Sequence, residues 1–192
     1  MLRDSGLRGG QYRILSDDQI YDIHLASLHI LEETGVSVRD ETALKVLGSS
    51  GAEVDHKNLR AFVPAYIVEE AVKKCPRSVT LCGRDPENDL MLENRRVHFG
   101  NGGSALYTLD LATLRRRKAI KRDIQDLAML VDRLENIHFY FIPLYPHDVP
   151  AEIADRHRFE AALRYSMKHV AGSVNSRQAV IDVLGMAEAI AG

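Results

Sequence analysis

The alternation of helical and strand patterns after residue 123 is the feature that most constrains the fold. The expected elements are a helix at 123–136, a strand at 137–142, a helix at 151–168, a strand at 169–174 and a helix at 176–190. The first strand is a nearly continuous run of bulky apolar residues, which is typical of a strand buried on both faces. This order predicts parallel βα architecture, in a barrel or a doubly wound sheet.

The length of the chain limits how much of a barrel it can form. A (β/α)8 barrel needs roughly 250 residues, and the chain has 192. We therefore expect an α/β fold: a partial (β/α)8 TIM barrel with an N-terminal α+β extension. The expected division is a flexible arm at 1–15, the extension at 16–122 and the first βα units at 123–192.

Local signals place the elements of the extension. Ser16 and Asp40 are expected to cap helices, and residues 52–63 alternate around a polar turn, which predicts a β-hairpin. Asp123 is expected to be the N-cap of the helix that follows the extension, and Ser176 the N-cap of the last helix.

Composition narrows the class of protein. Hydrophobic residues make up 45% and charged residues 27% of the chain, and the net charge is −2, the balance of a soluble globular protein. We expect a cytoplasmic protein that binds neither nucleic acid nor membrane, because there is no net basicity, secretory signal or long apolar run. Cys75 and Cys82 fit no metal or redox spacing, so no metal site is expected.

Several short stretches resemble one enzyme family in their order and spacing. They are Leu31-Glu-Glu-Thr-Gly-Val-Ser-Val38, Gly51-Ala-Glu-Val-Asp55, Val68-Glu-Glu-Ala71, the segment from Phe99 to Asp123, Asp148-Val-Pro150 and Ser166-Met-Lys-His169. Together they resemble landmarks of the trimethylamine methyltransferase (MttB) family, in the first half of a much longer protein. The resemblance covers nearly the whole chain from Ser16.

This resemblance implies a chemistry and its partners. The family's enzymes move a methyl group from trimethylamine or a quaternary amine, such as glycine betaine, to a cobalt corrinoid. The corrinoid (cobalamin) is carried by a separate partner protein, so this chain binds no cofactor directly. Pyrrolysine, which marks the trimethylamine enzymes, lies in the family's second half. The chain alone is expected to be inactive and to form a homo-oligomer. No catalytic residue is identified.

A glycine-rich stretch is the first candidate site. Asn101, Gly102 and Gly103 follow a β-prone run, and two interpretations remain open: a plain tight turn, or a loop facing the substrate or the corrinoid. A dinucleotide loop is excluded, because the third glycine is missing and no helix pattern follows.

Two further stretches are candidates. Tyr145, His147 and Asp148 follow the best strand, where barrel enzymes place functional groups, although Asp148 is also a plausible helix cap. Arg115, Arg116, Arg117 and Lys118 form a basic cluster, which is either a solvated loop or a docking surface for an acidic corrinoid protein.

An alternative function belongs to another class: a truncated, non-catalytic α+β module that binds a protein partner through the basic cluster. The two hypotheses differ in the behaviour of the isolated chain. Unclosed apolar strands favour aggregation or dimerisation of a barrel fragment, whereas a complete module is expected to be a soluble monomer.

Overall fold

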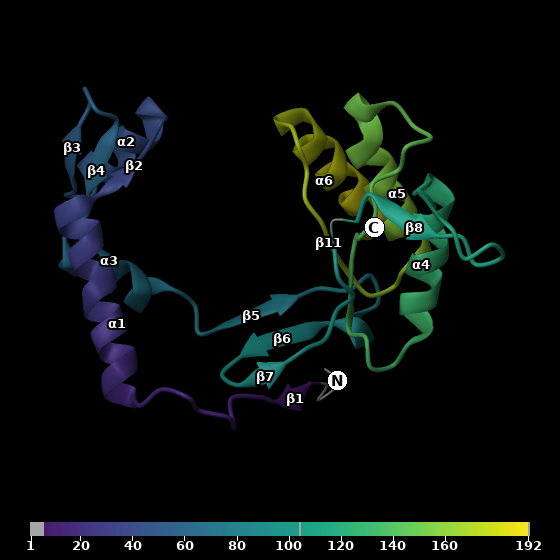
Figure 1. The fold of residues 1–192 in the computed structure, drawn as a ribbon, viewed down its shortest axis with the longest axis horizontal. Coiled ribbons are helices and arrows are strands. Elements are labelled where there is room, and N and C mark those ends of the chain that lie inside the picture. Colours follow the sequence, from purple (N-terminus) through teal and green to yellow (C-terminus); the bar gives the residue numbers. More distant parts are fainter. Residues whose placement is uncertain (1–5, 104, 192) are drawn as a thin grey trace. The chain divides into compact units, whose positions relative to one another are not determined.

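The computed structural model describes residues 6–103 and 105–191, which form two compact units (Figure 1). The smaller unit is Gly10–Arg77, and the larger unit joins the residues before Gly10 to those after Arg77. The boundary expected at residue 122 lies inside the larger unit, because Gly100 and Ala105 form parallel bridges with Phe139 and Leu144, which come after it. Each unit is described by itself below.

The smaller unit packs helices against a three-stranded antiparallel sheet with strand order β2-β4-β3. Its elements are α1 (Asp17–His29), which continues as a π-helix (Ile30–Thr34), β2 (Val36–Ser37), α2 (Glu41–Ser49), β3 (Glu53–Asp55), β4 (Arg60–Phe62) and α3 (Ala65–Lys74). The expected caps are confirmed: the Ser16 hydroxyl accepts a hydrogen bond from the Gln19 N–H, and the Asp40 carboxylate accepts one from the Ala43 N–H. The predicted hairpin at 52–63 is β3 and β4.

Short antiparallel pairs begin the larger unit. β5 (Ser78–Leu81) pairs with β6 (Leu90–Glu93), and β8 (Tyr107–Leu109) pairs with β9 (Arg116–Lys118). A 3-10 turn (Pro86–Asn88) lies between β5 and β6. β1 (Leu7–Arg8) pairs with β7 (Arg96–Val97). Part of the segment expected to be a flexible arm therefore has a place in a two-stranded sheet.

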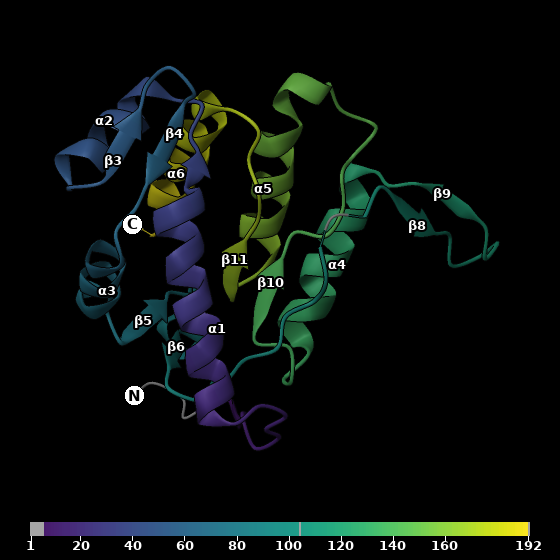
Figure 2. The ribbon, with the colours of Figure 1, turned by 60° about the vertical axis from the view of Figure 1, so that its left-hand side comes forward.

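A parallel layer with helices on one side forms the rest of the larger unit (Figure 2). Its elements are α4 (Lys121–Arg133), β10 (Phe139–Phe141), a 3-10 turn (Ala151–Ile153), α5 (Ala154–Tyr165), β11 (His169–Ala171) and α6 (Arg177–Ala191). β10 and β11 are parallel, with Phe139 opposite His169. The predicted α/β alternation is confirmed, and the Ser176 hydroxyl accepts from the Ala179 N–H, as expected of a cap.

A third extended segment runs parallel to β10 on the edge away from β11. Gly100 and Ala105 form parallel bridges with Phe139 and Leu144. The Ala105 N–H donates to the Pro143 carbonyl at 2.6 Å, and the Tyr145 N–H donates back to Ala105 at 3.2 Å. The three parallel segments therefore lie side by side in chain order. Gly100–Gly103 belongs to the first of them and is not the tight turn that was one interpretation of the sequence.

The core lies between this layer and its helices. Tyr140, Ile142 and Leu144 point to the same face and are buried with Ile124 and Ala128 of α4. The Tyr140 hydroxyl donates to the Ile124 carbonyl at 3.0 Å. This fixes which face of β10 the helices cover.

Asp123 is not the N-cap of α4. The helix begins at Lys121, so Asp123 is its third residue, and its carboxylate accepts from the Ile120 N–H at 2.8 Å. A carboxylate at either position satisfies an unpaired N–H of the first turn, so the sequence pattern alone could not separate them.

Candidate functional site

The candidate site is the rim formed by the carboxyl ends of the three parallel segments. The connections that leave these ends are residues 106–120, 142–153 and 172–176. Enzymes with parallel βα layers place their reacting groups at this end. The rim therefore collects the basic cluster, Tyr145, His147 and Asp148, whereas Asn101, Gly102 and Gly103 lie within the first parallel segment.

The glycines of the first segment make room for two aromatic rings. A Cβ on Gly100 would lie 2.3 Å from the Phe139 ring, and a Cβ on Gly103 would lie 2.4 Å from the Phe141 ring. Because side chains alternate along a strand, both rings lie on the face of β10 opposite Tyr140. The absence of side chains at these glycines thus lets two half-buried rings pack against the backbone of the first segment. They lie on the face of the layer that faces away from the helices.

Asn101 has a structural partner in β10. Its side-chain amide donates to the Phe141 carbonyl at 2.7 Å and accepts from the Phe141 N–H at 3.0 Å. The side chain thus replaces a backbone strand partner between the two parallel bridges. Gly102 and Gly103 beside it are exposed.

Tyr145, His147 and Asp148 lie together on the loop after β10, each with its own partner. The Asp148 carboxylate accepts from the Lys121 N–H at 2.8 Å, which satisfies the first residue of α4. Asp148 is therefore a helix cap, as one interpretation held, but of α4 and not of the helix near Ala151. The His147 ring nitrogen Nδ1 lies 3.3 Å from the Ala119 carbonyl.

The tautomer of His147 follows from this contact. A carbonyl oxygen only accepts, so this contact requires a proton on Nδ1. The ring is exposed at the rim and meets Tyr145 edge-on at 5.8 Å between centroids. His147 thus presents an exposed ring beside Tyr145 at the rim.

The structure separates the basic cluster into two groups. Arg117 makes a bidentate pair with Asp123, with both N–O distances 2.7 Å, and also contacts Asp110. This pair lowers the pKa of the Asp123 carboxyl and raises that of Arg117. Arg115, Arg116 and Lys118 are exposed on the hairpin.

A buried ionic group at the rim has no counterpart among the sequence candidates. Asp155 and Arg158, on α5, form an ion pair whose side chains are only 9% and 7% exposed. Arg158 donates to the Ser173 carbonyl, and Asp155 accepts from the Asn175 N–H at 2.7 Å. These bonds hold the loop after β11. The available signal was two opposite charges three residues apart on the expected helix, where other charged residues lie at similar spacing.

The opposite end of the layer holds a second polar group. Lys168, buried before β11, donates to the carbonyls of Val131, Leu134 and Ile137 at 2.6–2.7 Å. His169 contacts the Cys82 carbonyl at 2.9 Å. These contacts give Lys168 and His169 a structural role at this end of the layer.

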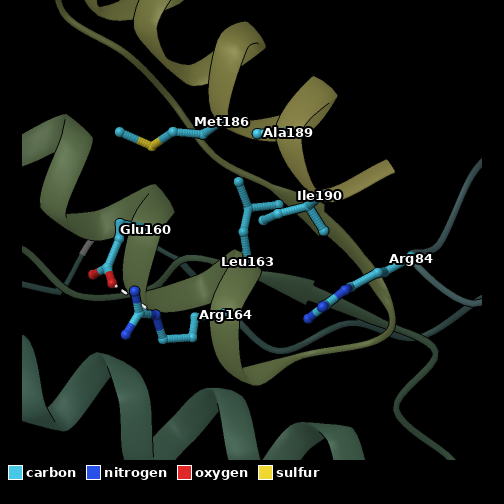
Figure 3. A pocket seen from close by; sticks show the side chains of 7 residues that line it. All are labelled: Arg84, Glu160, Leu163, Arg164, Met186, Ala189 and Ile190. Atoms are coloured by element: carbon cyan, nitrogen blue, oxygen red, sulfur yellow. Dashed lines mark ion pairs between the residues drawn. The ribbon is translucent and has the colours of Figure 1, made fainter. Parts of the chain in front are cut away.

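A groove of about 340 Å³ lies between α5 and α6 (Figure 3). Leu163, Met186 and Ile190 line it, and the Glu160–Arg164 ion pair and Arg84 lie at its border. It belongs to the helix side of the unit and includes no rim residue. Within the described ranges, no three His, Cys, Asp or Glu side chains gather as a metal site, and no helix could span a membrane.

Comparison with known proteins decides the family. The family model described as trimethylamine methyltransferase (MTTB) matches residues 6–192. The chain belongs to this family. The landmarks seen in the sequence are thus features of its N-terminal part.

Individual relatives agree with this assignment. The chain is 33% identical over 177 residues to the trimethylamine methyltransferase MttB of Desulfitobacterium hafniense, covering 92% of this chain and 36% of the relative. It is 29% identical to a glycine betaine methyltransferase of that species, covering 95% and 38%. The Methanosarcina barkeri MttB is 28% identical, over 86% and 34%. The chain thus spans about a third of the length of these relatives.

Proposed function

We propose that the chain is the N-terminal part of a methylamine methyltransferase and forms the first βα units of its barrel. We further propose that the whole protein moves a methyl group from trimethylamine or a quaternary amine to a corrinoid held by a partner protein. The observation that carries the proposal is the family match over residues 6–192. Relatives named for trimethylamine and for glycine betaine both match, which supports a methylated amine as the substrate class.

The arrangement of the parallel layer supports the barrel. Its three segments follow chain order, and α4, α5 and α6 pack on one another in sequence on the same side. A doubly wound sheet reverses its strand order and carries helices on both faces, whereas a barrel keeps the order and places all helices outside. The chain order and the shared helix side therefore support the barrel in this proposal.

The uncovered face of the layer suits a methylated cation. The rings of Phe139 and Phe141 lie on this face, and an aromatic face attracts a quaternary ammonium by cation–π interaction. The corrinoid would supply the nucleophile that takes the methyl group, and the task of these residues would be to bind and orient the amine.

The test begins with the reading frame beyond the codon for Gly192. We expect the protein encoded by the whole frame to transfer methyl groups from trimethylamine or glycine betaine to cob(I)alamin, and residues 1–192 alone to show only background transfer. An amber codon within the frame would select trimethylamine. A stop codon directly after Gly192, or no transfer from either amine by the longer protein, would sink the proposal and leave the protein-binding module as the better function.

A further inference from the structure

The β8–β9 hairpin leaves the rim directly after the first parallel segment and projects from its unit (Figure 2). Its register sorts the side chains into two faces. Tyr107 lies opposite Lys118, and Leu109 lies opposite Arg116, so these four share one face. Thr108 and Arg117 share the other, where Arg117 binds Asp123.

The first of these faces is exposed, apolar and cationic. Leu109 is 60% exposed, and at the tip Leu111 and Leu114 are 91% and 74% exposed. Arg116 lies over the Tyr107 ring at 4.4 Å. Arg115, Arg116 and Lys118 make no ion pair with any residue in the described part of the chain. We call the surface formed by these side chains the hairpin face; its residues are Tyr107, Leu109, Leu111, Leu114, Arg115, Arg116 and Lys118.

Hydrogen bonds at the tip of the hairpin and an ion pair at its root fix the conformation of the hairpin face. At the tip, one Asp110 carboxylate oxygen accepts from the N–H groups of Ala112 and Thr113 at 3.2 and 2.9 Å. At the root, Arg117 ties the hairpin to the first turn of α4 through Asp123. The exposed leucines and cations are therefore presented by an ordered ribbon, which reduces the conformational entropy lost when a partner binds.

We propose that the hairpin face is the docking site for the protein that carries the methyl-accepting corrinoid, and that this partner meets it with an acidic surface around an apolar pocket. The inference rests on the proposed function. Three unpaired cations select a partner of opposite charge, and adjacent exposed apolar side chains are typical of protein–protein contacts. The rim is also where a corrinoid must arrive to reach an amine bound on the uncovered face.

Binding of residues 1–192 to the purified, cobalamin-loaded corrinoid protein of the same methyl-transfer system tests this, measured by titration calorimetry at 50 and 300 mM NaCl. We expect affinity to fall at least tenfold with the added salt. The double variant Arg116→Glu with Lys118→Glu, and separately Leu111→Asp, should each weaken binding tenfold or more. The matched control is Arg133→Glu, an exposed arginine at the far end of α4, which should stay within twofold of the unmodified chain.

Circular dichroism spectra and melting midpoints equal to those of the unmodified chain show that the variants fold. The docking proposal is overturned if the unmodified chain does not bind, if the hairpin variants bind equally well, or if Arg133→Glu weakens binding as much. It is also overturned if the variants abolish association between copies of the chain and leave corrinoid protein binding intact.

Methyl transfer from the amine to free cob(I)alamin by the protein of the whole reading frame separates the two proposals. This reaction needs no docking, so the hairpin variants should leave its rate unchanged. Absence of this transfer without any substitution counts against the proposed function. A normal rate combined with unimpaired docking of the hairpin variants counts against the hairpin face alone.

Discussion

At the scale of single residues, we expect the buried Lys168 to stabilise the junction between α4 and β11. Its ammonium lies at the carboxyl end of α4, where three carbonyls accept from it and the helix dipole favours a positive charge. We expect Lys168→Met to lower the free energy of unfolding by about 3 kcal/mol, because buried carbonyls lose a charged donor. Urea unfolding at low micromolar concentration measures this.

The control for Lys168 is Lys118→Met, which removes an exposed lysine and should change the free energy of unfolding by less than ~0.5 kcal/mol. A loss below about 1 kcal/mol at Lys168 would show that water or rearranged side chains replace its bonds.

His138 is expected to make stability depend on pH. Burial, and then the neighbouring His98, lower its pKa below the ordinary value, and its Nδ1 accepts the Phe99 N–H at 2.9 Å, which requires an unprotonated nitrogen. The unfolded chain therefore takes up the proton first. The contribution is full above about pH 6.5 and is lost as the pH falls through the folded pKa.

A proton NMR titration of the His138 ring measures this directly, and the midpoint should lie below about 6.5. In unfolding experiments between pH 7 and 5.5, His138→Gln should lose less stability on acidification than the unmodified chain. A midpoint above the ordinary value would contradict the prediction.

At the scale of elements, the first turn of α4 joins the hairpin to the loop after β10. The Asp123 carboxylate accepts hydrogen bonds from the Ile120 N–H and the Arg117 guanidinium, and the Asp148 carboxylate accepts one from the Lys121 N–H. We expect Asp123→Asn to lower the free energy of unfolding by about 1–2 kcal/mol at pH 7, because it loses a charged partner of the helix start. The measurement is urea unfolding, with Asp126→Asn as control; Asp126 is on the same helix and pairs with the exposed Arg122.

The pH dependence of this change has a definite sign. Arg117 lowers the pKa of Asp123, so the stabilisation is present above the unfolded value of about 3.9 and is lost as the pH falls through the folded value. The difference between the unmodified chain and Asp123→Asn should therefore shrink below about pH 4. An equal difference at pH 3 and pH 7 would contradict this.

The elements also show what could be predicted from sequence. Ser16, Asp40 and Ser176 were identified as caps because cap and partner lie three residues apart. Partners of Asn101 and Asp148 lie 40 and 27 residues away. No local pattern contains such pairs, so their roles became visible only once the parallel segments were placed side by side. The order of helices and strands was predictable for the same reason as the caps, because the periodicity that marks each element lies within a few neighbouring residues.

At the scale of the whole molecule, the larger unit ends in a helix with apolar residues on most of its surface. Ala179 and Val183 of α6 face α5, whereas Val180, Ile181 and Leu184 are 41%, 53% and 58% exposed. A helix that is apolar all round is normally covered on all sides. β11 also has a partner on one edge only among the described strands. In a barrel, the next βα unit would cover both.

These surfaces predict self-association of residues 1–192. We expect sedimentation velocity to show dimers or larger species at tens of micromolar, because an apolar helix face and an open strand edge favour pairing with another copy. Ile181→Glu combined with Leu184→Glu should shift the chain towards the monomer, since charges on the exposed face oppose burial. The control, Val72→Glu, changes an equally exposed apolar residue on α3 and should leave the distribution unchanged. A chain that stays monomeric at about 100 micromolar, a few times the concentration at which association is expected, would contradict this prediction. It would also remove this support for a barrel fragment, because a complete module has no need to cover α6.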